Sequence, residues 1–460
     1  MERIEKYSTV TVILLLTIGF LFRLYTAAII PIVNADEQKE IAFAKGISFE
    51  PGNLNLPVGD REMKNPLLTS YVLKLGIFLF GESKLGGRLL FILLSTFSLF
   101  FIYKLVEENL GVKCALLSLC FLIFSQYHIG LIRIVDNGSL YFSFLPPTLY
   151  VFFKVLTSKE VKYVFLTVLL VGFGSLVYEG MALLYLVVVF YLFIDKKYRF
   201  WLKRKEFYLS FILLLIIVFP FLIWNYFNNF IKLEDEHFWD FGFSLRSFYL
   251  YFGELLAWFG QHSSLFSWNL SEEAIYLHRP GKEPAFLSGI SNEFPIIHFP
   301  LAILIIIAYI YCLFHHKKNE LIKFCLFIFG SVFLVTSIIA GSYTLLDDHW
   351  WADMTLFPGV VLCAYMLFDF QAKCRVIKFF IAAIIIYFFF HCVHFINLPE
   401  SQFALPPDSL YQYYLNKAEE YLSNNEKHIA QNRCHWVLAR AKNPAIIGRA
   451  KNILGRISDD

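Results

Sequence analysis

The sequence predicts an all-α polytopic membrane protein, and three features carry this prediction: the composition, the length of the apolar runs and the placement of the basic residues. Of the 460 residues, 58% are hydrophobic and 52 are phenylalanine. A soluble domain of this length cannot bury so much apolar surface, whereas helices that face lipid leave theirs exposed. The first apolar run is too long for a signal peptide and lacks a small-residue cleavage site, so we expect a retained span.

The apolar runs follow one another with no internal repeat and no Gly/Ser linker between them. A helix needs roughly 20 residues to cross the hydrocarbon layer, and several runs are shorter than this, so their boundaries are soft. The runs cover residues 10–30, 66–81, 86–104, 114–129, 138–156, 163–178, 181–195, 207–227, 297–314, 321–341, 355–370 and 376–396.

Lysine and arginine decide the predicted orientation, because short loops rich in these residues stay in the cytoplasm. The assignment is consistent only if run 66–81, which follows Pro66 and contains Lys74 and Gly76, lies along the membrane surface. About eleven spans then remain, with the N-terminus inside and the C-terminus outside. The basic clusters lie at residues 3–6, 104–113, 154–162, 196–205, 317–323 and 373–378.

This topology places four loops on the outer face, at 31–85, 130–137, 228–296 and 342–354, together with the tail after 397. We expect a membrane domain over 1–396 and a short helical tail on the outer face over 397–460. The tail has helical patterns at 411–422 and 436–454. The 8 cysteines show no spacing typical of a disulfide framework or a zinc site. No Walker loop or dinucleotide fingerprint is present, so we expect neither direct nucleotide use nor a nucleic-acid partner.

Two adjacent carboxylates, Asp36 and Glu37, follow the first span directly. One interpretation is that one of them is a general base, held near the bilayer surface, that activates an acceptor hydroxyl or amine. The other interpretation is structural, since aspartate is a good N-cap and acids favour the first turn of a helix. The phase of Ile41, Ala42 and Lys45 fits a short surface helix after the pair.

Further acids lie at the outer ends of later spans. Asp136 follows Arg133 in the outer loop, where an ionisable group faces a cavity, pairs with a partner or caps a helix. Tyr178 and Glu179 form a tight outer turn, which is either a contact for a polar ligand or ordinary turn chemistry.

A third acidic segment reads Asp347-Asp348-His349-Trp350-Trp351. Its carboxylates and histidine suit a divalent cation or a polar ligand. Its tryptophans suit either a sugar platform or the aromatic belt of a membrane interface. We take Tyr178, Glu179, His349 and Trp350 as candidate contacts for a sugar or an acceptor.

Basic residues on the predicted outer face oppose the positive-inside rule and therefore need an explanation. Arg61, Lys64 and Arg88 are the main examples. A phosphate or pyrophosphate head group explains them, because lysine and arginine neutralise the charge of such a leaving group. The alternative is contact of snorkelling side chains with ordinary lipid head groups.

These residues together resemble the GT-C integral membrane glycosyltransferases, in the branch of the protein O-mannosyltransferases and lipid A aminoarabinose transferases. The resemblance is clearest over the first hundred residues, and later spans match only in kind. The matching positions are Arg23 before Pro31, Asp36-Glu37, Met63-Lys64-Asn65-Pro66, Leu79-Phe80-Gly81, Gly87-Arg88, Asp136, and His349 with Pro358.

The resemblance implies a GT-C fold, with interfacial helices in the first outer loop, and a catalytic role for the domain 1–396. It implies a polyprenyl-phosphate sugar donor and a lipid, glycan or protein acceptor reached from the outer face of a membrane, for which we expect the bacterial inner membrane. Asp36 would be the base, with Glu37 and Asp136 as further catalytic acids. Lys64 and Arg88, with Arg61, would hold the lipid phosphate.

The chain departs from the aminoarabinose transferases beside Lys64. Those enzymes have an acid immediately before the basic residue, whereas this chain has Met63 there and Glu62 one place earlier. The reaction requires no cofactor, and it allows a divalent cation. The candidate metal ligands are Glu62, Asp348 and His349.

Three other classes of protein stay open. A flippase or transporter of lipid-linked sugars predicts charges and broken helices in mid-membrane together with an internal repeat, and the sequence has neither. A polysaccharide ligase or polymerase needs arginines and a histidine in outer loops, which Arg246, Arg279 and His278 supply. A non-catalytic scaffold would not explain the group of Asp36, Lys64 and Asp136.

Overall fold

The structure is a computed structural model whose described residues form helices and no strand, apart from one isolated bridge between Ser48 and Asn55. The residues divide into two compact units, 1–267 with 285–397 and 268–284 with 398–460. The structure describes residues 2–29, 35–49, 55, 57, 68–125, 128–129, 132–135, 137–178, 180–228, 299–315, 319–339, 350–373, 379, 381–386, 408–423, 427–438 and 443–459.

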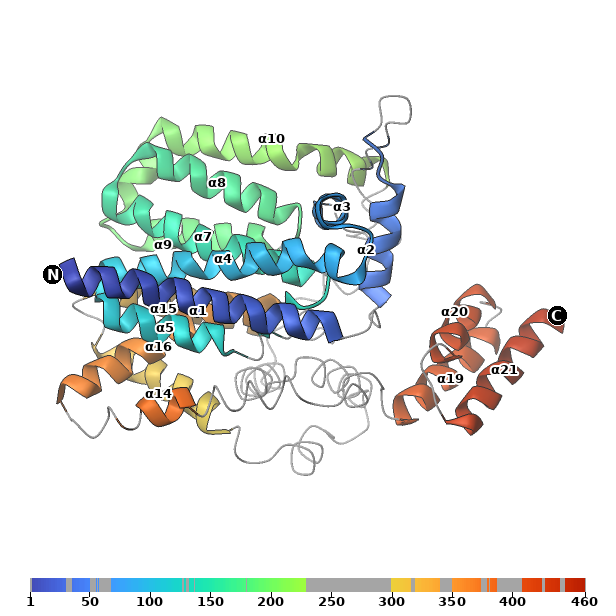
Figure 1. The fold of residues 1–460 in the computed structure, drawn as a ribbon. Helices are drawn as coiled ribbons and strands as arrows, with labels where there is room; N and C mark the ends of the chain where they lie inside the picture. Colours follow the sequence, from blue (N-terminus) through green and yellow to red (C-terminus); the bar gives the residue numbers. More distant parts are fainter. Residues whose placement is uncertain are drawn as a thin grey trace. The chain divides into compact units, whose positions relative to one another are not determined.

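The first unit is a bundle of long apolar helices that run side by side (Figure 1). Helix α4 lies against α1, α5 and α7, and α8 lies between α7 and α10. The bundle contains α1 (Glu2–Ile29), α4 (Lys84–Leu110), α5 (Val112–Ile123), α7 (Asn137–Ser158), α8 (Val161–Ser175), α9 (Gly180–Ile194), the short 3-10 helix η1 (Arg199–Lys203), α10 (Lys205–Phe227), α14 (Phe299–His315), α15 (Glu320–Ile339) and α16 (Trp350–Lys373).

Within the described residues, five helical segments are long and apolar enough to cross a membrane, and four shorter apolar helices accompany them. The predicted class, an all-α polytopic membrane protein, is therefore confirmed. The count of about eleven spans extends to residues outside the described ones and stays a prediction. The five long segments are Thr9–Ala28, Lys84–Leu110, Asn137–Ser158, Lys205–Phe227 and Met354–Gln371.

Two helices of the first unit lie across the bundle. Figure 1 shows α3 (Leu68–Phe80) end-on beside α4, and α2 (Ala35–Gly46) running across the ends of its neighbours. Helix α3 has 13 residues, too few to cross a bilayer on its own. Both helices agree with the predicted interfacial helices of the first outer loop.

Glycines permit the tight turn between α3 and α4. Gly81 has φ +90°, a left-handed conformation that glycine adopts without steric cost. A Cβ on Gly86 would lie 2.2 Å from the Gly81 carbonyl oxygen. The Ser83 side chain caps α4 by accepting a hydrogen bond of 2.9 Å from the Gly86 amide. The turn therefore fixes where α4 begins, and so it also fixes the position of Arg88 near the start of that helix.

The second unit contains three described helices, α19 (Asp408–Ser423), α20 (Lys427–Leu438) and α21 (Pro444–Asp459). Their core includes Leu415, Cys434 and Ile453. The predicted helix at 436–454 is wrong as a single element, because α20 ends at Leu438 and α21 begins at Pro444. Proline lacks an amide hydrogen and favours the first position of a helix, so it starts a new one. The outer-face location of this unit stays a prediction.

Candidate functional site

Helix α2 presents a polar stripe to the bundle within its buried face. Glu37, Glu40, Ala44 and Ile47 are each at most 1% exposed. Their spacing of three, four and three residues keeps Glu37, Glu40 and Ala44 on one side of α2, and Ile47 follows just after the helix ends. Burial of two carboxylates in such a stripe requires partners for both, because an unpaired buried charge is strongly disfavoured.

Glu37 finds its partner in Arg88, the first charged residue of α4 after the Gly86-Gly87 pair. Arg88 Nε donates to Glu37 Oε1 and Arg88 Nη2 donates to Glu37 Oε2, and each of these hydrogen bonds is 2.6 Å long. Both side chains are buried. Nη1 of Arg88 donates to the carbonyl oxygen of Ala27 at 2.7 Å, near the end of α1. This pairing of two N–H groups with two carboxylate oxygens joins α1, α2 and α4.

A third segment reaches the same carboxylate from the loop before α7. The backbone amide of Val135 donates to Glu37 Oε1 at 3.2 Å. Two residues earlier, Arg133 is fully buried, and burial together with the Arg88 cation lowers the pKa of its guanidinium to about 9. The segment that carries Arg133 therefore reaches the Glu37–Arg88 pair through the Val135 amide.

Helix α3 contacts α2 and α7 through side chains of its first turn. Ser70 donates a hydrogen bond from its hydroxyl to Glu40 Oε2, and Thr69 donates to the side-chain oxygen of Asn137, the first residue of α7. All four side chains are buried. These contacts hold α2, α3 and α7 together at one end of the bundle.

A third buried arginine, Arg23, lies on α1. Arg23 on α1 donates to the carbonyl oxygens of Leu122 and Ile123 at the end of α5. Its Nη2 is also 2.7 Å from His128 Nδ1, which accepts because a guanidinium can only donate. This arginine therefore satisfies the end of α5 just before the loop that leads to Arg133.

The structure brings together only some of the sequence-predicted residues. Glu37 and Arg88 meet, and Val135 ties the segment beside Asp136 to them. Tyr178 is buried against Tyr141, with ring centroids 6.0 Å apart. Asp36 belongs to the first turn of α2 and Trp350 begins α16, but their side chains are outside the description. Arg61, Glu62, Lys64, Asp136, Glu179, Asp348 and His349 lie outside the described residues.

The pairing of Glu37 with Arg88 was not part of the sequence interpretation, which gave the acid a catalytic role and the arginine a phosphate. Neither role is tested by the contact. The sequence did carry one signal for it, since an arginine that opens an apolar span needs a nearby anion. Glu40 and Ser70 were missed because nothing in the pattern separates Glu40 from a solvated surface acid.

Among the described residues, no group of three or more His, Cys, Asp or Glu side chains is arranged to hold a metal ion. The candidate ligands Glu62, Asp348 and His349 lie outside these residues.

A comparison of the sequence with models of known protein families finds a match over part of the chain. Residues 64–224 match the model of the family described as Dolichyl-phosphate-mannose-protein mannosyltransferase. The predicted resemblance to GT-C glycosyltransferases is confirmed for this segment, which contains α3, α4, α7 and Arg88. No curated protein sequence matches the chain.

Two solved structures of ArnT from Cupriavidus metallidurans are similar to the chain. The apo form has 14% identity and a TM-score of 0.44. The form bound to undecaprenyl phosphate has 16% identity and a TM-score of 0.43. In each case the similarity covers 78% of this chain and 77% of the other. At this level neither structure assigns a substrate or a residue's role to this chain.

Proposed function

We propose that the chain is a glycosyltransferase that moves a sugar from a polyprenyl-phosphate carrier to an acceptor at the outer face of a membrane. The observation that carries the proposal is the family match over residues 64–224, a segment that supplies Arg88 to the buried pair with Glu37. That pair fixes the first turn of α2. The candidate base, Asp36, lies in the same turn, directly before Glu37.

The geometry of α2 supports different roles for the two adjacent acids, Asp36 and Glu37. Successive positions of a helix are about 100° apart, so positions 36 and 37 lie on different faces of α2. Glu37 is committed to Arg88 and the Val135 amide. We therefore assign Glu37 a positioning role, and Asp36 is the candidate base.

The role assigned to Arg88 also changes, from binding the donor phosphate to positioning. Arg88 is a positioning residue whose guanidinium holds Glu37 and the end of α1. Lys64 and Arg61 precede α3 and are the candidates for the donor phosphate.

The proposed reaction is a single displacement. The acceptor hydroxyl or amine loses its proton to the Asp36 carboxylate, and its lone pair forms a bond to the anomeric carbon. The bond between that carbon and the phosphate oxygen breaks, and the polyprenyl phosphate leaves with the electron pair. Configuration at the anomeric carbon inverts. Lys64 and Arg61 stabilise the leaving phosphate, and placement of the reactants supplies much of the rate.

The sugar and acceptor are expected to contact Tyr178, Glu179, His349 and Trp350, with Asp136 orienting groups near the base. The acceptor class stays open between lipid, glycan and protein. The location in a bacterial inner membrane, with the site on the periplasmic side, is part of the proposal. A flippase of lipid-linked sugars or a polysaccharide ligase would use the same membrane location with different chemistry.

The test is transfer by the purified chain, reconstituted in vesicles with labelled polyprenyl-phosphate hexoses and pentoses. Mass spectrometry of envelope lipids, glycans and proteins from cells with and without the chain identifies the acceptor. The proposal predicts a sugar-modified acceptor and released polyprenyl phosphate. Movement of intact lipid-linked sugar across the vesicle, with no new glycosidic bond, would establish the flippase instead.

A further inference from the structure

The first turn of α3 bonds to a third segment besides α2 and α7. The Thr69 and Ser70 hydroxyls donate to α7 and to α2, and the hydroxyl of the next residue, Tyr71, donates to the carbonyl oxygen of Pro57 at 2.8 Å. Successive positions of a helix are about 100° apart, so three consecutive positions face three different sides. This one turn therefore joins three separate parts of the chain.

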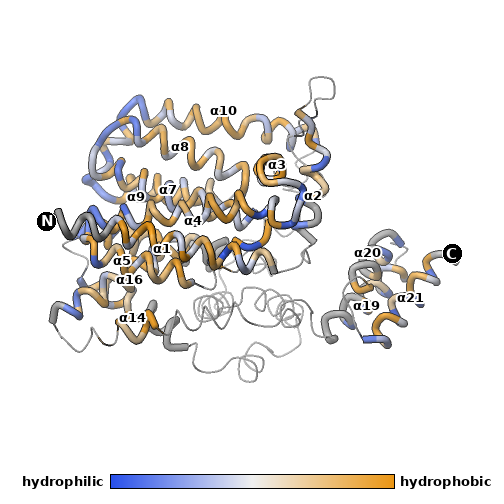
Figure 2. Tube along the Cα trace, in the orientation of Figure 1, coloured by the Kyte–Doolittle hydropathy of each residue, from blue (hydrophilic) through white to orange (hydrophobic). Residues whose placement is uncertain are grey.

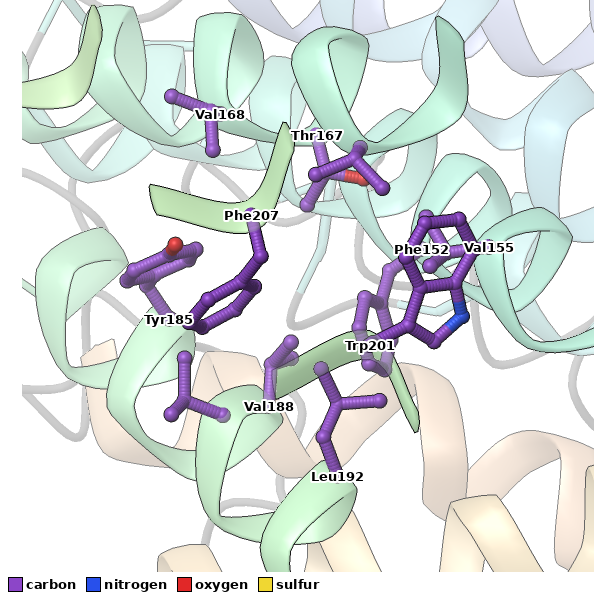
Figure 3. A pocket seen from close by; sticks show the side chains of 11 residues that line it. Phe152, Val155, Thr167, Val168, Tyr185, Val188, Leu192, Trp201 and Phe207 are labelled. Atoms are coloured by element: carbon purple, nitrogen blue, oxygen red, sulfur yellow. The ribbon is translucent and has the colours of Figure 1, made fainter. Parts of the chain in front are cut away.

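Several other buried hydroxyls of the bundle bond within their own helix. Ser95 on α4 and Thr148 on α7 each donate over 2.7 Å to a carbonyl oxygen of the helix that carries them. Thr167 on α8, which Figure 3 shows among largely apolar side chains, does the same over 2.8 Å. Such a bond does not join two segments, because donor and acceptor belong to one helix. Thr69 and Ser70 differ, since their acceptors lie on other helices.

Helix α3 also packs closely against the start of α4. A Cβ on Gly76 would lie 3.2 Å from the Gly87 carbonyl oxygen, and a Cβ on Gly87 would lie 2.9 Å from the Leu73 side chain. Glycine at both positions lets the two helices approach this closely. Because α4 is a long helix within the bundle, α3 is a fixed reference to which its three hydroxyls tie the other segments.

Burial makes two of these bonds costly to lose. Thr69, Ser70, Glu40 and Asn137 are all buried. A buried oxygen that loses its donor cannot bond to bulk water instead. Figure 2 shows mainly hydrophobic residues along α3 and hydrophilic residues along part of α2, so α2 depends on such donors on its buried side. The two hydroxyls therefore favour a single placement of α2 and of the start of α7.

Each of the three segments leads to a residue of the proposed transferase site. Helix α2 carries the candidate base Asp36. The residue directly before Asn137 is Asp136, and the chain that follows Pro57 leads to Lys64. The three hydroxyls of α3 therefore bond to the segments of the proposed base, of the second acid and of the lysine proposed for the donor phosphate.

We infer that Thr69, Ser70 and Tyr71 are positioning residues of the transferase site. They act through the segments that accept their hydrogen bonds, and they set these segments relative to one another and to α4. The inference rests on the proposed function and adds residues for which the sequence indicated no role. Each hydroxyl serves one segment, so its removal should alter one step of the reaction. Ser70 and Thr69 serve the transfer step, and Tyr71 serves the binding of the donor.

The test is steady-state transfer by the full-length protein in vesicles, together with titration by labelled polyprenyl phosphate. Ser70→Ala and Thr69→Val should each lower kcat by about tenfold or more, because a small displacement of a catalytic group is costly. Their affinity for polyprenyl phosphate should stay unchanged. Tyr71→Phe should have the reverse effect. It should weaken that affinity by about twofold to tenfold, the contribution of one hydrogen bond, and leave kcat unchanged.

Matched variants remove hydroxyls that do not join these segments. Ser95→Ala and Thr148→Val each lose a buried bond within one helix, and Tyr208→Phe loses the bond to the Leu202 carbonyl oxygen. All three should transfer at the wild-type rate. Ser70→Thr keeps a hydroxyl at the same position and should restore turnover, which separates the hydrogen bond from the change of side chain.

Hydrogen–deuterium exchange of the same proteins gives a readout that does not depend on transfer. Ser70→Ala should speed exchange of the α2 amides, and Thr69→Val should speed exchange at the start of α7, with melting temperatures close to those of the matched variants. If the wild-type protein transfers sugar and the α3 variants match their controls in kinetics or in exchange, the inference is overturned and the proposed function stands. No transfer by the wild-type protein would overturn the proposed function, and this inference with it.

Discussion

Arg88 and Glu37 face each other with two parallel hydrogen bonds, each 2.6 Å long, and both side chains are buried. The pair joins α4 to α2 across 51 residues of sequence. It lies beside the residue proposed as the base, so its integrity decides both the stability of this end of the bundle and the placement of Asp36.

Breaking the pair should destabilise the protein. Arg88→Ala leaves Glu37 buried without its cation, which is expected to lower the free energy of unfolding by about 3–5 kcal/mol. Thermal unfolding in detergent measures this loss. The double variant Glu37→Leu/Arg88→Met should recover much of the stability, because replacing both charges by apolar groups removes the desolvation cost.

The same double variant separates a structural role from a positioning role. If the pair positions Asp36, turnover should stay low in the double variant even where stability returns. Normal turnover in a stable double variant would mean that the pair contributes only to folding.

The turn between α3 and α4 should tolerate no side chain at Gly86. A Cβ there would lie 2.2 Å from one backbone oxygen and 2.9 Å from another, so the backbone has to move. Gly86→Ala is expected to destabilise the protein by at least about 1–3 kcal/mol. Gly448→Ala is the control, since nothing lies within 4 Å of a Cβ at that position. Similar melting temperatures for both variants would argue against this packing.

Lys64 should contribute strongly to binding of the donor's polyprenyl phosphate. A charge-assisted hydrogen bond contributes about 1.5–3 kcal/mol, so Lys64→Ala should weaken binding of polyprenyl phosphate by roughly tenfold or more. Lys45→Ala removes an exposed lysine from the last turn of α2 and should leave affinity unchanged. Titration of the purified variants with labelled polyprenyl phosphate measures both. An unaltered affinity in Lys64→Ala would remove this residue from the phosphate site.

The predicted orientation can be tested by cysteine labelling from outside intact cells. Substitutions at Asn53, Ser271 and Ser423 should react with a membrane-impermeant maleimide, and a substitution at Lys197 should not, because the basic loops stay inside. The unsubstituted chain sets the background. Reaction at Lys197→Cys from the outside would reverse the orientation and place the proposed site in the cytoplasm.

Much of the fold could be predicted from the sequence because length and hydrophobicity alone define a membrane helix. Run 138–156 corresponds to α7, 163–178 to α8 and 207–227 to α10. The surface position of run 66–81 followed from loop charges and agrees with α3, which lies across the bundle. The helix predicted at 436–454 ignored Pro444, which begins α21.

The candidate site was predicted less completely, for a physical reason. Periodicity identifies which face of α2 is buried, but it does not say which distant cation meets Glu37. That choice depends on how α1, α2 and α4 pack, and the pairs Arg88–Glu37 and Ser70–Glu40 join segments 51 and 30 residues apart. Arg23 was noted only by its place before Pro31, whereas in the structure it contacts His128 and the end of α5.

The central claim is that Asp36 is the base of a sugar-transfer reaction, and Asp36→Asn tests it most directly. Asparagine keeps the size and hydrogen bonding of the side chain and caps a helix as well as aspartate does. General base catalysis typically contributes about 10²–10⁴-fold. Turnover by the purified, reconstituted Asp36→Asn variant should therefore fall by that order while binding of polyprenyl phosphate persists. Near-normal transfer by a folded Asp36→Asn variant would contradict the account and leave Asp36 as a helix cap.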